Sequence, residues 1–175
     1  ASEESGTLLA VGHNFLSLPG YDRLKKAREQ RKIGRVSAAE FNWCFPLAPL
    51  RSGPFGLWML REPKNLLLEL APHLFAFAVD LFGEIDVLDV LLSHPTQLPG
   101  GATRHQSWRI LARAGHVDIT VNLSTVETLD DRSLTLRGSN GLARFDYAAD
   151  ALVVRSENAA DLIVNPLVNQ LTQSF

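Results

Sequence analysis

The clearest pattern in the chain is a strict alternation of apolar and polar residues in its second half. From His116 to Ser124, Val, Ile or Leu occupies every second position and polar residues lie between them. This period of two is typical of a β-strand with one buried face and one polar face. The same alternation predicts further strands over Asp86–Ser93, Ser107–Ala112, Ser133–Arg137, Ala143–Tyr147 and Ala151–Arg155.

Short turn-forming segments connect several of these strands. They are Ala114-Gly115, Ser139-Asn140-Gly141 and Ala148-Ala149-Asp150. Connections of this length and composition favour hairpins between consecutive antiparallel strands. We therefore predict that the second half of the chain forms an antiparallel meander.

The first half of the chain contains one long apolar segment, Leu66–Phe82. We predict a buried helix there, because Glu69 and Asp80 make the segment too polar for a membrane span. Gly83 is placed where a helix would end, and we expect Pro72 in the first helical turn, where it costs no hydrogen bond.

Two further strands and a helix are predicted before this segment. Thr7–Val11 is a short apolar run that favours a buried parallel strand. Tyr21–Lys32 is rich in helix-forming residues, and Gly34 is placed to cap its C-terminus. Val36–Phe45 follows as a strand. The order of elements predicts an α+β fold.

Composition excludes several classes of partner. The 17 Lys and Arg residues against 19 Asp and Glu residues give a net charge of -2 over 175 residues, which offers no footprint for nucleic acid or an anionic membrane. The single cysteine, Cys44, cannot form an internal disulfide, and the polar start carries no signal peptide, so we expect a cytoplasmic protein. Because Met59 is the only methionine, we expect a piece of a longer protein.

Glu69 and His73 are the strongest candidates for acid–base chemistry in the sequence. Their spacing of four puts both side chains on one helix face, where a carboxylate can fix the tautomer of an imidazole and raise its proton affinity. A buried histidine that is merely satisfied by a carboxylate gives the same pattern. Glu69 and His73 could also supply two metal ligands, but no third is evident, so we predict no metal site.

Two other segments carry candidate binding residues. His13 and Asn14 follow the predicted first strand at its carboxyl end, where open α/β sheets bind ligands, although Asn14 could equally hold a turn. Trp58 and Arg61 could stack on and hydrogen-bond a sugar or polyol, although such a tryptophan can also anchor a loop.

Phosphate-binding and nucleophile motifs are absent from the sequence. It contains no Gly-x-Gly-x-x-Gly, no Gly-x-x-x-x-Gly-Lys and no Gly-x-Ser-x-Gly. The chain by itself therefore lacks a nucleotide-binding loop.

Three stretches, taken in order, resemble the Gfo/Idh/MocA family of NAD(P)-dependent oxidoreductases. The first runs from Val11-Gly12-His13-Asn14-Phe15 through a basic helix to Gly34-Arg35-Val36. The second is Trp58 followed by Leu68-Glu69-Leu70-Ala71-Pro72-His73 and the apolar segment. The third is Ser133–Arg155, which is similar to a hairpin near the end of the family's open sheet.

The resemblance implies a fold and a domain division. Residues 1–34 would be the remnant of a Rossmann domain, namely its last strand and crossing helix. Residues 35–175 would form an α+β substrate-binding and oligomerisation domain, truncated at its C-terminus, with a mostly antiparallel open-faced sheet and helices on one face. A homo-oligomer through the open sheet face is implied too, and it would explain apolar residues left on that face.

The resemblance also implies roles for individual residues. His73 takes the place of the catalytic histidine and Glu69 that of the acidic residue four positions before it. His13 and Asn14 would lie at the cofactor. The substrate side would comprise Tyr21, Trp58, Arg61 and Asn65.

The activity implied is oxidation of a sugar or polyol hydroxyl, with NAD or NADP bound by the full-length protein. No cofactor is expected on this chain alone, which would be inactive. The sequence departs from the family at Ala71 in place of glycine, at Asn65-Leu66-Leu67-Leu68 in place of a Gly-Gly pair, and at Leu16 in place of arginine. A non-catalytic module for self-association or carbohydrate binding, derived from the same fold, is the alternative.

Overall fold

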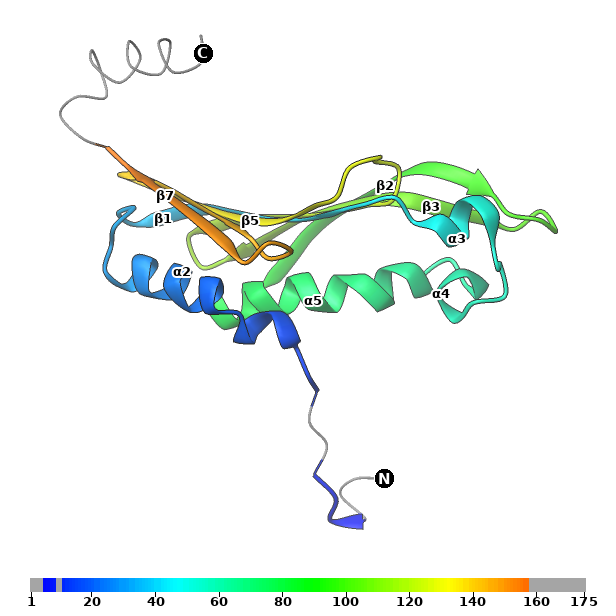
Figure 1. Ribbon diagram of the computed structural model, residues 1–175, viewed down its shortest axis with the longest axis horizontal. Coiled ribbons are helices and arrows are strands. Elements are labelled where there is room, and N and C mark those ends of the chain that lie inside the picture. Colours follow the sequence, from blue (N-terminus) through cyan, green and yellow to red (C-terminus); the bar gives the residue numbers. More distant parts are fainter. Residues whose placement is uncertain (1–4, 9–10, 158–175) are drawn as a thin grey trace, which may run out of the picture.

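Seven strands form one mixed sheet in the computed structural model, which describes residues 5–8 and 11–157. The strands are β1 (Val36–Cys44), β2 (Asp86–Gln97), β3 (Thr103–Ala114), β4 (Val117–Ser124), β5 (Asp131–Gly138), β6 (Gly141–Asp146) and β7 (Ala151–Ser156). The helices are η1 (Asn14–Ser17), α2 (Pro19–Glu29), α3 (Ala48–Ser52), α4 (Trp58–Arg61) and α5 (Asn65–Phe82). Helices α2 and α5 both lie below the sheet in Figure 1, and no helix of the described residues covers the upper face, which we call the open face.

The sheet has the strand order β2-β3-β4-β1-β5-β6-β7. The predicted hairpins β2–β3, β3–β4, β5–β6 and β6–β7 are confirmed as antiparallel pairs. The predicted meander is wrong at its centre, because β1 lies between β4 and β5 and runs parallel to β4. Strand β1 carries Phe41 and Trp43, which are buried. Its central position keeps these side chains covered, and it lets the backbone of β1 form hydrogen bonds with a neighbouring strand on each side.

The core lies between the sheet and α5. Leu74 and Phe77 of α5 are fully buried, and so are Phe41 of β1 and Val121 of β4 on the covered face. Within the described residues, α5 is the one helix long and apolar enough to cross a membrane. Its buried side packs on the sheet, as the sequence predicted.

The interior of α5 contains Pro72, contrary to the expectation of a first-turn proline. A proline inside a helix leaves one carbonyl, here that of Leu68, without its helical partner. Leu68 and Pro72 both lie on the exposed side of α5, so that water can replace the lost hydrogen bond. The predicted end is confirmed: Gly83 has a φ of 82° and its N–H donates to the Val79 carbonyl.

Helix α2 ends earlier than predicted. Arg31, with a φ of 53°, caps the helix in the left-handed conformation that we expected of Gly34. The Lys32 N–H donates to the Ala27 carbonyl and the Arg31 N–H donates to the Arg28 carbonyl, which is a Schellman motif. Asp150 secures the other end of the helix, because its Oδ1 accepts the Gly20 N–H at 2.7 Å.

The strand predicted over Thr7–Val11 is not formed by the described residues of that segment. Thr7, Leu8 and Val11 are in irregular, exposed structure, and residues 9–10 lie outside the described part of the chain. The sheet contains no strand from Thr7, Leu8 or Val11, and no strand of the described chain lies beside these residues in Figure 1.

The open face of the sheet is polar at its centre. The residues that point to this face from the central strands include Glu40, Asn42, Thr120, Asn122, Ser133 and Thr135. The expectation of apolar residues on this face is therefore wrong for the middle of the sheet. Large exposed apolar side chains gather instead on edge strand β2, at Val87, Leu88, Val90, Leu91 and Leu92.

Candidate functional site

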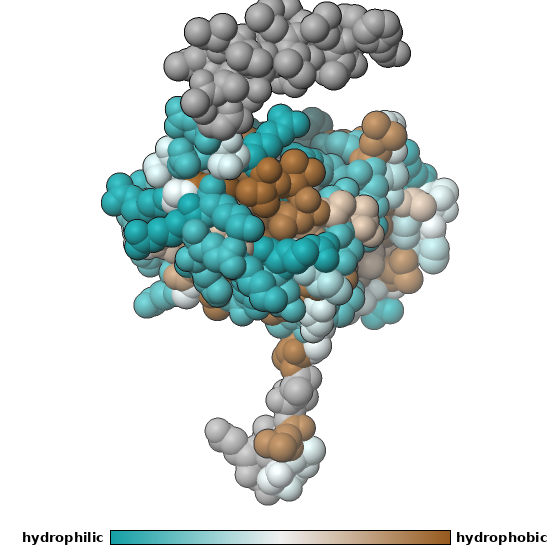
Figure 2. Space-filling view, turned by 60° about the vertical axis from the view of Figure 1, so that its left-hand side comes forward, coloured by the Kyte–Doolittle hydropathy of each residue, from teal (hydrophilic) through white to brown (hydrophobic). Residues whose placement is uncertain are grey.

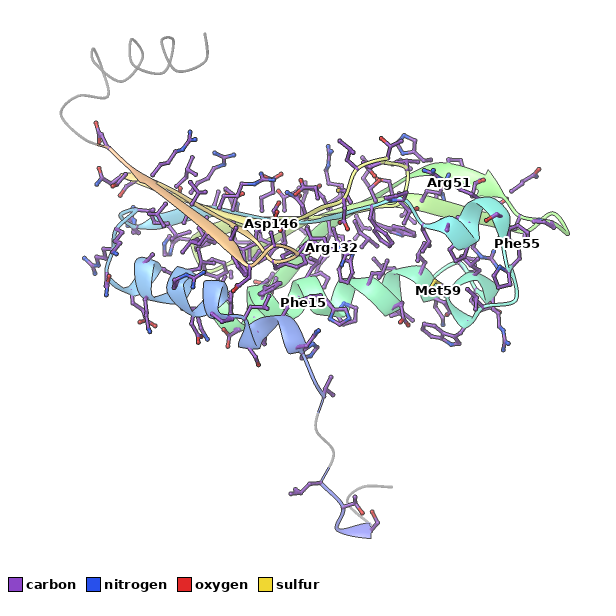
Figure 3. The ribbon with its side chains drawn as sticks, viewed as in Figure 1. Phe15, Arg51, Phe55, Met59, Arg132 and Asp146 are labelled. Carbon is purple, nitrogen blue, oxygen red and sulfur yellow. The ribbon has the colours of Figure 1, made fainter. Side chains whose placement is uncertain are left out.

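His73 lies in a group of aromatic rings that come from three separate elements. Its ring centroid is 5.4 Å from that of Trp43 on β1, 5.5 Å from that of Phe15 on η1 and 6.2 Å from that of His13 just before η1. We call His13, Phe15, Trp43 and His73 the histidine cluster. Figure 3 shows Phe15 below the sheet and Arg132, near the start of β5, higher than Phe15 in this view.

Three ring nitrogens of the histidine cluster are buried without a hydrogen-bond partner among the described residues. They are Nδ1 of His13, Nδ1 of His73 and Nε1 of Trp43. A buried polar atom left unpaired costs about 1–3 kcal/mol, and such atoms are rare in native structures. Three of them in one cluster leave ring nitrogens available to a hydrogen-bonding group from outside the described residues.

The pKa of the His73 imidazole lies below its ordinary value of 6.5. Burial is the main cause, because it penalises the charged form, and nearby His13 adds to the effect. Glu69 opposes both, but it is an exposed residue and forms no hydrogen bond with His73 among the described residues. The expected rise in proton affinity is therefore wrong: His73 is held neutral near pH 7, with a nitrogen free to accept a proton.

The buried Tyr147 packs against the histidine cluster, and a second buried tyrosine, Tyr21, packs against Phe77. The Tyr147 ring lies 5.1 Å from that of Phe15, and its hydroxyl donates to the Asn42 carbonyl at 2.6 Å. Tyr21, predicted on the substrate side, is fully buried, and its hydroxyl donates to Asp80 at 2.7 Å. Burial raises the pKa of both hydroxyls, so both stay protonated. The structure thus places Tyr21 in the core rather than in an opening.

The other residues predicted on the substrate side meet at the far end of α5. Asn65 is buried and its amide donates to the Trp58 carbonyl at 2.7 Å, while Arg61 Nε donates to the Gly56 carbonyl at 2.9 Å. The Trp58 side chain is half exposed. At 1.5 Å per residue, Asn65 precedes His73 by roughly 12 Å along the helix. The structure brings these residues together, but not to His73.

His13 precedes η1, and Asn14 is the first residue of η1. His13 joins the histidine cluster, whereas Asn14 is exposed. Sequence reasoning assigned no role to Phe15 or Trp43. Alternation in the predicted strand Val36–Phe45 places Trp43 on the core face, but no local pattern shows that this face meets His73.

Other chemistry is limited in the described part of the chain. No three His, Cys, Asp or Glu side chains there lie close enough to hold a metal ion. Cys44 is half-buried, and burial is the main cause that raises its pKa to about 11. Its thiol stays protonated near neutral pH and is a poor nucleophile there.

Comparisons with known proteins identify the fold. No family model and no curated protein matches the sequence. Among solved structures, the chain is similar to levoglucosan dehydrogenase in complex with NADH and levoglucosan, with a TM-score of 0.71 and 19% identity over 87% of this chain. It is also similar to the WlbA dehydrogenase of Bordetella pertussis in complex with NADH and UDP-GlcNAcA, with a TM-score of 0.68 and 18% identity over 98% of this chain.

A third similar structure is the inositol dehydrogenase homologue of Azotobacter vinelandii in complex with NAD+, with a TM-score of 0.68 and 10% identity over 89% of this chain. The match covers 45% of the levoglucosan dehydrogenase and of the inositol dehydrogenase homologue, and 51% of the WlbA chain. The chain thus spans about half the length of the dehydrogenases whose fold it shares.

Proposed function

We propose that this chain is the substrate-binding part of an NAD(P)-dependent oxidoreductase of the Gfo/Idh/MocA type, acting on a sugar or polyol hydroxyl. Residues 1–34 would be the end of its dinucleotide-binding domain and residues 35–175 its substrate domain. One observation carries the proposal: His73 is held neutral in a cluster whose ring nitrogens lack partners. The shared fold with NAD-dependent sugar dehydrogenases supports it.

The chemistry required of the chain is proton removal. Oxidation of a secondary alcohol releases one proton from the hydroxyl and one hydride from the carbon. The neutral His73 imidazole accepts the hydroxyl proton, and the resulting charge is stabilised by Glu69, the one acidic group that favours protonated His73. The bound nicotinamide would take the hydride.

The histidine cluster fits the reacting end of such a cofactor. Phe15 supplies an apolar ring surface next to His73, and His13, which also contacts His73, supplies an unpaired Nδ1. His13 and the exposed Asn14 would therefore border the nicotinamide. The sequence carries no Gly-rich phosphate loop, so the pyrophosphate would be bound elsewhere in a longer protein.

The group around Trp58 would contact a different part of the substrate. Arg61 and Asn65 direct hydrogen-bond donors to backbone carbonyls, which leaves the exposed Trp58 ring as the available surface. Because this group lies roughly 12 Å from His73 along α5, it can reach only the distal portion of an extended substrate.

The first test is to read the coding sequence upstream of Ala1. The proposal predicts an open frame of roughly 120 codons that encodes Gly-x-Gly-x-x-Gly after a strand, and then Glu-Lys-Pro. A start codon just before Ala1, or an unrelated upstream domain, would contradict the catalytic role.

The second test is turnover of the protein that contains both parts. His73→Gln should lower kcat by about 100-fold or more while substrate binding is retained, because the proton acceptor is lost. The matched control is His105→Gln on β3, away from the histidine cluster, and it should change kcat by less than about twofold. Equal effects of the two substitutions would refute the role of His73.

A non-catalytic self-association or carbohydrate-binding module is the second candidate. The exposed apolar side chains of β2 favour it, because an apolar edge strand invites pairing with another chain. Under the enzyme proposal a homo-oligomer would form through the open sheet face instead. For both candidate functions, the enzyme and the non-catalytic module, we expect a cytoplasmic protein. Turnover by the longer protein separates the two candidates, since a module has none to lose.

A further inference from the structure

A cleft of about 650 Å³ lies at the end of the molecule where α2 ends and β1 begins. The last turn of α5 and the β3–β4 and β5–β6 turns complete its walls. Figure 2 looks toward this end, where hydrophilic residues surround an apolar patch. A volume of this size is typical of small-molecule sites.

The lining of this cleft is strongly cationic. It contains Arg28, Arg31 and Arg35 together with His116, and no carboxylate of the described residues lines it. Within the described residues, the side chains of these three arginines form no ion pair or hydrogen bond. Elsewhere in that part of the chain Arg113, Arg132 and Arg144 are each paired with an aspartate. Three unpaired guanidinium groups around one cleft, in a chain of net charge -2, indicate an anion-binding site.

The end of helix α2 does not cancel this charge. A helix C-terminus carries about half a negative charge, against three full positive charges here. The Schellman motif further occupies the carbonyls of Ala27 and Arg28 with the N–H groups of Lys32 and Arg31. The arginine side chains are therefore not needed as caps for these carbonyls.

The cleft also contains a flat apolar surface. The guanidinium carbon of Arg28 lies 5.3 Å from the centre of the Phe82 ring, a cation–π contact that holds the arginine at the cleft. Gly34 and Gly115 contribute backbone without side chains to the lining. The site thus combines donors for anionic oxygens with a ring surface for a planar or apolar group.

We propose that this cleft binds a small phosphate-bearing molecule, whose phosphate oxygens are held by Arg28 and Arg35 and whose planar or apolar part lies against Phe82. Arginine is favoured at such sites because its planar fork matches phosphate oxygens in pairs. Phe82 follows His73 by nine residues, roughly 13 Å along α5, so this site is separate from the histidine cluster. The proposal does not depend on the proposed function.

The test is a calorimetric titration of the 175-residue chain with pyrophosphate and with ADP at low salt. Both should bind with dissociation constants below about 1 mM, and ADP more tightly. The double variant Arg28→Gln, Arg35→Gln should weaken binding of both at least tenfold. The matched control is Lys26→Gln, which removes one positive charge from the exposed side of the same helix, outside the cleft lining, and should change binding by less than twofold.

A second readout locates the bound molecule. In the ¹H–¹⁵N spectrum, ADP should shift the backbone amides of Gly115 and His116 and leave those around His73 unchanged. Absence of binding up to 10 mM pyrophosphate, or equal weakening by the Lys26→Gln control, would overturn the proposal. ADP that binds no more tightly than pyrophosphate would overturn the role of Phe82.

Discussion

The two faces of the sheet hold polar groups in different ways, although Thr135 Oγ1 and Ser124 Oγ on the open face are also buried without a hydrogen-bond partner among the described residues. On the open face the Asn122 amide donates to Asn42 at 2.8 Å, and the Asn42 amide donates to Ser133 at 3.3 Å, which gives a ladder across three strands. On the covered face the histidine cluster keeps three buried ring nitrogens unpaired. The ladder pairs polar side chains of neighbouring strands with one another, whereas the three ring nitrogens are gathered in one cluster and have no partner among the described residues.

The difference also separates stability from function. Apolar residues of the covered face supply most of the packing, and the polar ladder fixes how the central strands align. The histidine cluster contributes unpaired groups that lower stability and are useful only with a ligand. Functional sites typically show this conflict with local rules of stability.

The largest expected effect is on the covered face. Phe77→Ala should lower the free energy of unfolding by about 3–5 kcal/mol, because a fully buried ring that contacts Tyr21 and Tyr147 leaves a cavity. Urea unfolding followed by circular dichroism measures the change. A loss below about 1 kcal/mol would show that α5 is not packed on the sheet as described.

An intermediate effect is expected on the open face. Asn42→Ala should cost about 1–3 kcal/mol, because it removes one rung and leaves the Asn122 amide and the Ser133 hydroxyl short of a partner. The same unfolding measurement applies. A cost below about 0.3 kcal/mol would show that water satisfies this face and that the ladder contributes little.

The smallest expected change in the free energy of unfolding is in the histidine cluster. Whether the substitution stabilises or destabilises the fold is the informative result. His73→Phe should leave stability at pH 7 unchanged or raise it by up to about 1 kcal/mol, because the ring is kept and an unpaired nitrogen is removed. A loss of more than about 2 kcal/mol would show that the imidazole is a satisfied structural residue.

Stability should also depend on pH through His73. The unfolded chain binds a proton near pH 6.5, and the folded chain binds it only at lower pH. Stability is therefore complete above pH 6.5 and falls as the pH drops from 6.5 through the lowered pKa. Unfolding curves at several pH values should show this component in the natural chain but not in His73→Phe.

Much of the fold was predictable from local pattern, but the assembly of the site was not. Period-two alternation located the strands of the second half, and the apolar run ended by Gly83 located α5. The position of β1 depends on pairing with β4, about 80 residues away by register, such as Ala38 with Asp118, and no turn signal encodes it. The spacing of Glu69 and His73 put them one turn apart on α5, but Glu69 is exposed and forms no hydrogen bond with His73 among the described residues.

The sequence could not show what surrounds that face. Trp43 and Phe15 reach His73 only through the packing of β1 and η1 on α5. Their aromatic surroundings reverse the expected direction of the His73 pKa, because burial outweighs the attraction of an exposed carboxylate. The residues that we expected around the substrate at Trp58 lie roughly 12 Å from His73, because His73 follows Asn65 by eight residues along α5. No sequence motif encodes this separation.

The pKa of His73, measured by a ¹H–¹⁵N titration of its imidazole, tests the central claim most directly. We predict a pKa below 6.5 in the natural chain, a higher value in His13→Ala and a lower value in Glu69→Gln, because His13 disfavours and Glu69 favours the charged ring. A pKa at or above 6.5 that neither substitution moves would contradict the account of His73 as a neutral proton acceptor.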